Sequence, residues 1–180
     1  NGGLPHETPA VTVNRLCGSG LQAIITAAQQ IETDQCDAAV AGGTEVMSRA
    51  QYWMPTARFG QRMGDGKIVD AMVGALTCPF DDTHMGITAE NVADKWDISR
   101  EDQDALAVTS HNRAEAAIKE GRFKDQILPI EITERRKTVV FDTDEHTRHG
   151  LTQPDLAKMR PAFKKDGSVT AGNASGINDA

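Results

Sequence analysis

The fold is decided by the stretch Asn14-Arg15-Leu16-Cys17-Gly18-Ser19-Gly20, a glycine-rich turn between two apolar segments. Residues 11–13 before it form a β-branched run, which is typical of a buried strand. Residues 21–31 after it are apolar on almost every side, which predicts a helix buried on most of its faces. Residues 38–41 predict a second buried strand, closed by two glycines. A strand, turn, helix and strand in this order indicate a βαβ unit of an α/β fold.

The rest of the chain predicts a loop or hairpin followed by separate helices and strands. Residues 48–70 hold several glycines and basic side chains with little periodicity, typical of an excursion that contacts other subunits. The strongest helix is predicted over 99–120, because Ser99 and Asp102 resemble a capping box and Gly121 is a stop signal. The other predicted elements are a helix over 87–95, strands over 130–133 and 138–141, and a short helix over 155–160.

Composition excludes several classes of protein. The 180 residues are 39% hydrophobic and 25% charged, as in globular domains, and carry a net charge of −7. This acidic balance argues against a nucleic-acid binder, and no apolar run reaches the roughly 18 residues of a membrane-spanning helix. The three cysteines form no CxxC pair, so we expect neither a disulfide framework nor a metal site, but a reduced, intracellular compartment.

Cys17 is the candidate nucleophile. It lies between the end of a predicted strand and the start of a predicted helix, where free backbone N–H groups and the helix dipole stabilise a thiolate. The flanking glycines let a substrate approach the backbone, and the same N–H groups can hold an oxyanion. The alternative interpretation is a buried structural cysteine, which is the usual state of a free cysteine.

The chain resembles the thiolases, the acetyl-CoA acetyltransferases, over nearly its whole length. The segment from Asn14 to Ala23 resembles the nucleophile segment of that family. Further blocks follow in the family's order: Ala41–Ser48, His84–Gly86, Thr88–Ala93, Ser99–Asp104, Gly121–Asp125, Arg148–Gly150, Met159–Phe163 and Val169–Gly176. The joint order of these blocks, more than any single one, carries the resemblance.

The resemblance implies a thiolase-like fold and a set of site residues. Cys17 takes the acyl group as a thioester, and its own N–H contributes to an oxyanion hole. His84 and Met85 lie beside the pantetheine and acyl pocket, and the His-Met-Gly triplet implies a short, acetoacetyl-type substrate. The other implied coenzyme A (CoA) contacts are Leu76, Arg148, Phe163, Ala171 and Ser175. Where many relatives have a serine that touches the adenosine part, this chain has Asp155.

CoA is a polyanion, so an acidic protein needs concentrated cations to bind it. Residues 135–165 hold ten basic or histidine side chains, a local patch that suits this ligand. The alternative interpretation is a solvated charged face, and the histidines have the same alternative. We expect no tightly bound cofactor, with CoA and acetyl-CoA as substrates.

The resemblance also implies the organisation of the chain. Residues 1–46 correspond to the later part of an N-terminal domain, residues 47–176 to an α+β loop domain, and residues 177–180 to the return into the first domain. Residues 52–70 correspond to the family's tetramerisation region, so we expect a homo-oligomer. The chain begins at Asn1 and has no basic-then-apolar leader, so we expect a central fragment of a cytoplasmic enzyme, with a mitochondrial or peroxisomal source as the alternative. The histidine, the second cysteine and the asparagine–histidine pair that complete the family's site are expected beyond residue 176.

The implied reaction is acyl transfer between CoA thioesters in fatty acid metabolism. Two molecules of acetyl-CoA give acetoacetyl-CoA and CoA, or short 3-ketoacyl-CoA is cleaved by thiolysis. One alternative is a condensing enzyme of the ketoacyl-synthase type, which lacks such a large loop domain. The other is a CoA-binding or oligomer-forming module with no turnover of its own.

Overall fold

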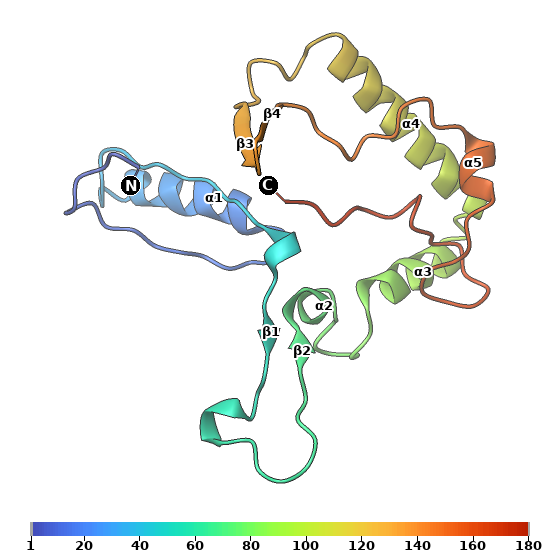
Figure 1. Ribbon diagram of the computed structural model, residues 1–180, viewed down its shortest axis with the longest axis horizontal. Coiled ribbons are helices and arrows are strands. Elements are labelled where there is room, and N and C mark those ends of the chain that lie inside the picture. The colour runs from blue at the N-terminus through green and yellow to red at the C-terminus, as the bar shows by residue number, and fades with distance from the viewer. Residues whose placement is uncertain (1, 180) are drawn as a thin grey trace. The chain divides into compact units, whose positions relative to one another are not determined.

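The computed structural model describes residues 2–179, which form two compact units. Unit 1 contains residues 2–75 together with Asp179, and unit 2 contains residues 76–178. Figure 1 shows the course of the chain through both. No helix within residues 2–179 is long and apolar enough to cross a membrane.

Unit 1 is built around α1 (Ser19–Glu32), which confirms the helix predicted over 21–31. Two predictions nearby are wrong: residues 11–13 and 38–41 pair with no other segment of the described chain and are not strands. A strand exists only through hydrogen bonds to a neighbour, and Figure 1 shows these segments running beside α1 rather than beside each other. The predicted burial is also wrong for unit 1 as described, because the side chains of these segments and the apolar residues of α1 are exposed or half-exposed.

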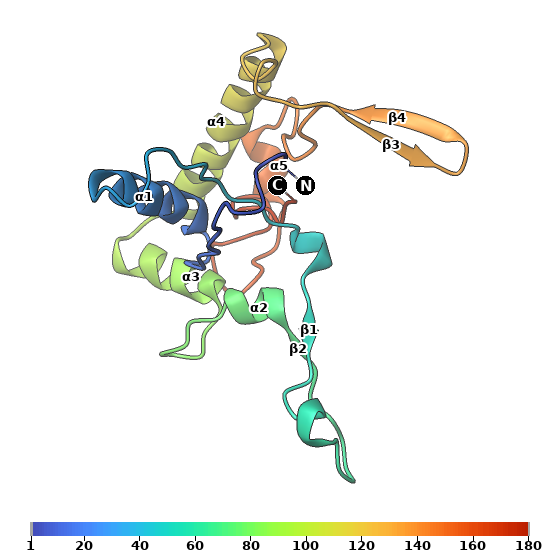
Figure 2. The same cartoon turned by 90° about the vertical axis from the view of Figure 1, so that its left-hand side faces the viewer.

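The predicted excursion at 48–70 is a hairpin, as the sequence indicated. After η1 (Met47–Arg49), β1 (Tyr52–Trp53) pairs antiparallel with β2 (Val69–Asp70). The long connection between them contains η2 (Ala57–Phe59), and α2 (Ala71–Ala75) follows directly. Figure 2 shows the hairpin extended as an arm.

The two ends of the long segment 47–178 meet within unit 1. Val46 and Asp179 form an antiparallel bridge, and the Ser48 N–H and hydroxyl donate to the two carboxylate oxygens of Asp179 at 2.8 and 2.5 Å. Both bonds lower the pKa of Asp179 below its ordinary value of 3.8, and the bond from the hydroxyl has the larger effect. The chain thus leaves and returns at one point. The predicted domain boundaries at 46 and 177 stay a prediction, since the two compact units divide after residue 75 and before residue 179.

Unit 2 begins with two helices, and the side chain of the residue directly before each helix caps its N-terminus. In α3 (Met85–Lys95) the His84 ring caps the N-terminus, and in α4 (Arg100–Lys119) the Ser99 hydroxyl accepts from Asp102 N–H at 3.1 Å. Gly121, at φ 71°, ends the second helix in the left-handed region that glycine adopts most easily. Both predicted helices and the predicted cap and stop are confirmed.

A hairpin and a short helix complete unit 2. The strands β3 (Ile130–Glu134) and β4 (Lys137–Phe141) pair antiparallel in the register Ile130 to Phe141, as predicted. Figure 2 shows this hairpin reaching away from α4. The helix predicted over 155–160 is instead α5 (Gln153–Ala157), because Thr152 and Asp155 form a capping box that sets its start earlier.

The core of unit 2 is small and partly polar. Its buried apolar residues are Ala93, Leu156 and Val169, and its buried polar residues are Glu90, Asp104 and Thr170. These come from α3, α4, α5 and the returning segment 168–175. Hydrogen bonds that the returning segment donates to buried carboxylates therefore hold it against the helices.

Candidate functional site

Cys17 lies on a tightly bonded turn. The preceding residue, Leu16, has a φ of 48°, a conformation that few non-glycine residues adopt and that is frequent at functional turns. The turn is held because Gly18 N–H donates to Arg15 O at 3.0 Å, while the Ser19 N–H and hydroxyl donate to Leu16 O at 3.0 and 2.7 Å. Ser19 Oγ in turn accepts from Arg15 N–H at 2.9 Å. The thiol of Cys17 is exposed at the apex.

The start of α1 offers hydrogen-bond donors beside this thiol. Within residues 2–179, the N–H groups of Cys17, Gly20 and Leu21 have no protein acceptor. A Cβ built on Gly43 would lie 3.0 Å from Gly20 Cα, so Gly43 lets the backbone approach the first turn of α1 closely. An exposed sulfur beside unpaired amides suits nucleophilic attack on a carbonyl and binding of the resulting oxyanion.

Four of the predicted CoA-binding residues gather at the start of α3. Met85 N–H donates to Leu76 O at 2.8 Å, which closes the loop between them. The His84 ring stacks on Phe163, with centroids 4.9 Å apart and planes 20° apart. A Cβ on Gly86 would lie 2.3 Å from the Phe163 ring, so only glycine lets this ring cover the helix start.

Ala171 and Ser175 lie on the returning segment, which a buried carboxylate holds in place. Glu90, only 1% exposed, accepts from the N–H and hydroxyl of Ser168 at 2.9 and 3.2 Å and from Val169 N–H at 2.9 Å. An antiparallel bridge between Pro161 and Thr170 brings the Phe163 segment beside this one. The close approach needs Gly167, where a Cβ would lie 2.2 Å from Glu90 Oε1.

A second buried carboxylate, Asp104 on α4, holds the rest of this segment. It accepts from Asn173 Nδ2 at 2.9 Å and from Arg100 Nε at 2.8 Å. Asn173 also accepts from Thr170 N–H at 2.8 Å and donates to Ser168 O at 3.0 Å. Facing α4, the segment borders a hollow of about 330 Å³ whose lining includes His111, His146, Thr147 and Ser175.

The family model for "Thiolase, N-terminal domain" matches residues 1–180. The chain belongs to the thiolase family. Its relatives include the beta-ketothiolase BktB of Cupriavidus necator, 60% identical over all of this chain and 46% of that protein. The acetyl-CoA acetyltransferase of Allochromatium vinosum is 54% identical over 98% of this chain and 45% of that protein. The chain thus spans just under half the length of these relatives.

Solved thiolase structures share the fold. The Bacillus anthracis acetyl-CoA acetyltransferase is 50% identical with a TM-score of 0.87, over 93% of this chain and 42% of that one. Human mitochondrial 3-ketoacyl-CoA thiolase in complex with CoA is 45% identical with a TM-score of 0.90, over 98% and 44%. The predicted α/β, thiolase-like fold is therefore confirmed, although the two strands at 11–13 and 38–41 are unpaired in residues 2–179.

Arg148 of this thiolase chain lies on a segment tied to α4 at two points one helical turn apart. Its N–H donates to His111 Nδ1 at 3.2 Å, and Gly150 N–H donates to Glu115 Oε2 at 2.8 Å. The pKa of His111 is lowered, mainly by burial and to a smaller extent by the nearby His146 and Arg148. A lowered pKa agrees with a neutral ring that accepts a hydrogen bond. Hydrogen bonds from Lys119 and then Gly150 lower the pKa of Glu115 from 4.5 to about 2.

Asp155, the departure from the family's serine, is engaged by its own helix. The Thr152 hydroxyl donates to its carboxylate, and Thr152 N–H does so at 3.1 Å. Both bonds lower the pKa of Asp155, and the bond from the hydroxyl has the larger effect. The carboxylate therefore serves as the N3 acceptor of the capping box at the start of α5, whose N-cap is Thr152.

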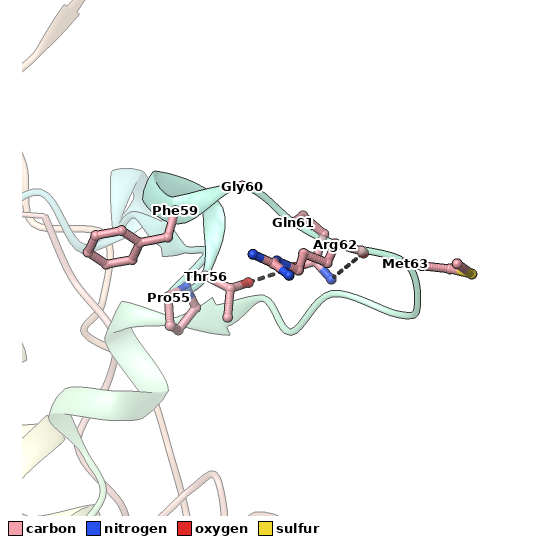
Figure 3. Close-up of a pocket in the computed structure, with 7 residues that line it drawn as sticks. All are labelled: Pro55, Thr56, Phe59, Gly60, Gln61, Arg62 and Met63. Atoms are coloured by element: carbon pink, nitrogen blue, oxygen red, sulfur yellow. Dashed lines mark hydrogen bonds between the residues drawn. The ribbon is translucent and has the colours of Figure 1, made fainter.

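A larger hollow, about 430 Å³, lies on the arm between β1 and β2 and is lined by residues 55–56 and 59–63. Figure 3 shows Phe59 and Met63 pointing away from each other there, and they are 87% and 103% exposed. None of the predicted site residues lines this hollow.

The structure divides the predicted site between the two units. Cys17 belongs to unit 1, whereas Leu76, His84, Met85, Arg148, Phe163, Ala171 and Ser175 belong to unit 2. Sequence analysis missed the residues that position them: Glu90, Asp104, His111, Glu115 and Asn173. Glu90, Asp104 and Asn173 lie inside blocks that carry the family resemblance, and those blocks were the signal by which they could have been found. Within residues 2–179, no cluster of three or more metal-ligating side chains occurs.

Proposed function

We propose that this chain supplies the nucleophile and the CoA-binding surface of an enzyme that transfers acyl groups between CoA thioesters. The observation that carries the proposal is the exposed thiol of Cys17 beside unpaired N–H groups at the start of α1. Membership of the thiolase family supplies the class of substrate.

The first step is attack of Cys17 Sγ on the carbonyl carbon of a CoA thioester. The carbon–sulfur bond to CoA breaks, CoA leaves as a thiol that takes up one proton, and the proton of Cys17 passes to a base that the resemblance places outside these residues. N–H groups beside the sulfur stabilise the oxyanion of the tetrahedral intermediate. The product is an acyl-enzyme thioester, which divides one difficult transfer into two easier steps.

In the second step the acyl group passes from Cys17 to a new acceptor. The α-carbon of a second acetyl-CoA loses a proton and attacks the acyl carbon, which gives acetoacetyl-CoA and restores the thiol. In the reverse direction a short 3-ketoacyl-CoA is cleaved. The His84-Met85 pair at the acyl pocket supports the short-chain assignment.

The residues of unit 2 would hold CoA along one surface. Leu76, Met85 and Phe163 offer apolar contacts to the pantetheine arm, and Ser175 offers a hydroxyl from the returning segment. Arg148 offers a cation to the nucleotide end, on a backbone tied to His111 and Glu115. The bonding of Asp155 to Thr152 keeps its negative charge within the helix cap.

The intact enzyme is proposed to be a cytoplasmic homotetramer. The exposed apolar side chains of the arm between β1 and β2 support an oligomeric contact, since Phe59 and Met63 have no neighbours to cover them within unit 1 of the described chain. The exposed apolar residues of α1 would likewise be covered by further parts of a thiolase, because the relatives are about twice as long.

The test is covalent capture of the acyl group. After incubation with acetyl-CoA, mass spectrometry of the peptides should show one acetyl group on Cys17 and none on Cys36 or Cys78. In the intact enzyme, Cys17→Ser should abolish thiolysis of acetoacetyl-CoA, while Cys36→Ser serves as the matched control and should retain it. Acetylation spread evenly over the three cysteines, or unchanged turnover in Cys17→Ser, would contradict the proposal.

A second candidate function is a CoA-binding module without turnover. It is favoured because the chain covers only 46% and 45% of the length of the two relatives. The 180 residues alone would then bind CoA without turnover. A binding measurement with CoA, run beside the thiolysis assay on the same sample, separates the two: affinity without activity identifies the non-catalytic module.

A further inference from the structure

The segment 146–150 is attached to α4 by two backbone hydrogen bonds whose acceptors differ in chemistry. Arg148 N–H donates to the imidazole nitrogen Nδ1 of His111 at 3.2 Å, and Gly150 N–H donates to the carboxylate of Glu115 at 2.8 Å. A neutral imidazole accepts at one nitrogen, but a protonated ring carries a hydrogen on both and accepts at neither. The first bond therefore exists only while the His111 ring is neutral, whereas the second needs only an ionised carboxylate.

The groups around His111 disfavour its protonated form. On the attached segment, the His146 ring lies 5.7 Å from it between centroids, and the Arg148 guanidinium is a further cation. On the returning segment, residues 172–175 border the same hollow as His111 and carry no charge. On α4 itself, the carboxylate of Glu115 lies one turn further along. Burial is the main cause that lowers the pKa of His111 below its ordinary 6.5, and His146 and Arg148 add to it.

The second attachment does not respond to pH in the range of histidine titration. The pKa of Glu115 is about 2, so its carboxylate stays ionised there. It also lies 3.5 Å from Nδ1 of His149, an ion pair that strengthens when His149 is protonated. Acidification therefore removes the hydrogen bond at Arg148 and leaves the one at Gly150 in place.

We propose that protonation of His111 releases the segment 146–148 from α4 while Gly150 stays attached, so that His111 is a positioning residue for Arg148 only when its ring is neutral. The attachment is complete at high pH and is lost as the pH falls. This deepens the proposed function and rests on it, because Arg148 is the cation offered to the nucleotide end of CoA. Release lowers the affinity for CoA on acidification, whereas the added charge of the ring would by itself raise it.

Two substitutions separate the hydrogen bond from the titration. In His111→Asn the side-chain oxygen takes the position of Nδ1, so an acceptor is present at every pH and nothing titrates. In His111→Phe a ring is kept, but no acceptor is present at any pH. His149→Asn is the matched control, because it removes a titrating ring from the same segment and leaves both backbone bonds to α4.

The measurement is backbone amide hydrogen exchange of the full-length protein between about pH 5 and about pH 8, where histidines titrate, resolved to single residues by mass spectrometry. Each rate is compared with that of an unstructured peptide at the same pH, which gives the protection of the amide. In the parent and in His149→Asn, protection of the Arg148 amide should fall about three- to tenfold on acidification, the effect of one neutral hydrogen bond. Protection of the Gly150 amide should stay constant. The Arg148 amide should stay protected at every pH in His111→Asn and unprotected at every pH in His111→Phe.

A parent in which protection of the Arg148 amide does not change with pH, or a His111→Asn variant with the parental pH dependence, would overturn the release. Titration calorimetry with CoA on the same proteins tests the consequence for binding. The fall in affinity on acidification should be about three- to tenfold greater in the parent than in His111→Asn. Equal pH dependence of affinity in the two would overturn the link to CoA. A parent that binds no CoA at any pH would instead contradict the proposed function and leave the exchange result unaffected.

Discussion

Replacement of Glu90 by glutamine tests whether a buried carboxylate holds the returning segment in unit 2. Glu90 is 1% exposed, and its two oxygens accept three hydrogen bonds from Ser168 and Val169. Glutamine has nearly the same shape but only one acceptor oxygen. Its NH₂ group would face a backbone N–H, and that donor would lose its partner.

The expected loss of stability follows from these bonds. One buried N–H left without an acceptor costs about 1–3 kcal/mol, and the remaining bonds lose the roughly 1 kcal/mol that the charge adds. The easier burial of a neutral amide opposes this, but the carboxylate is already fully hydrogen-bonded, so the lost bonds dominate. We expect the free energy of unfolding to fall by about 2–4 kcal/mol. For a chain of this size the melting temperature then falls by roughly 4–16 °C.

Thermal and urea unfolding of the parent and of Glu90→Gln provide the assay. Glu131→Gln is the matched control, because Glu131 lies exposed on β3 and should change stability by less than about 0.5 kcal/mol. If Glu90→Gln unfolds within that same margin of the parent, Glu90 does not hold the segment and the reasoning fails.

Three further predictions concern close approaches and charge. Gly43→Ala should destabilise the protein by about 1–3 kcal/mol in urea unfolding, because its Cβ would meet the backbone of Gly20 at 3.0 Å; unchanged stability would contradict the close approach. Gly86→Ala gains about 1 kcal/mol of helix propensity, but its Cβ would lie 2.3 Å from the Phe163 ring, so we expect net destabilisation and a raised KM for CoA thioesters in steady-state kinetics. Glu115, whose pKa falls from 4.5 to about 2 on folding, contributes stability that is present above pH 4.5 and lost as the pH falls towards about 2. The difference in melting temperature between the parent and Glu115→Gln should therefore shrink across that range, and a constant difference would argue against the bonds to Lys119 and Gly150.

Elements with local signals were predictable from the sequence. The cap at Ser99 and the glycine at 121 bound α4, and the charged turn between β3 and β4 sets that hairpin, because the interacting residues are only a few positions apart. The strands expected at 11–13 and 38–41 failed for the opposite reason. An apolar run indicates that a segment favours an extended, buried state, but only a neighbouring strand supplies the hydrogen bonds that make it a strand.

The candidate site shows the same division. The sequence by itself determined the family, the turn that exposes Cys17, and the residue types expected to bind CoA. Only the tertiary structure decided that Glu90 holds Ser168, 78 residues away, and that His111 accepts a hydrogen bond from the Arg148 N–H, 37 residues away. Local patterns specify helices, caps and turns, whereas a buried carboxylate or ring nitrogen acquires its partner only when the chain path brings a distant donor within hydrogen-bonding distance.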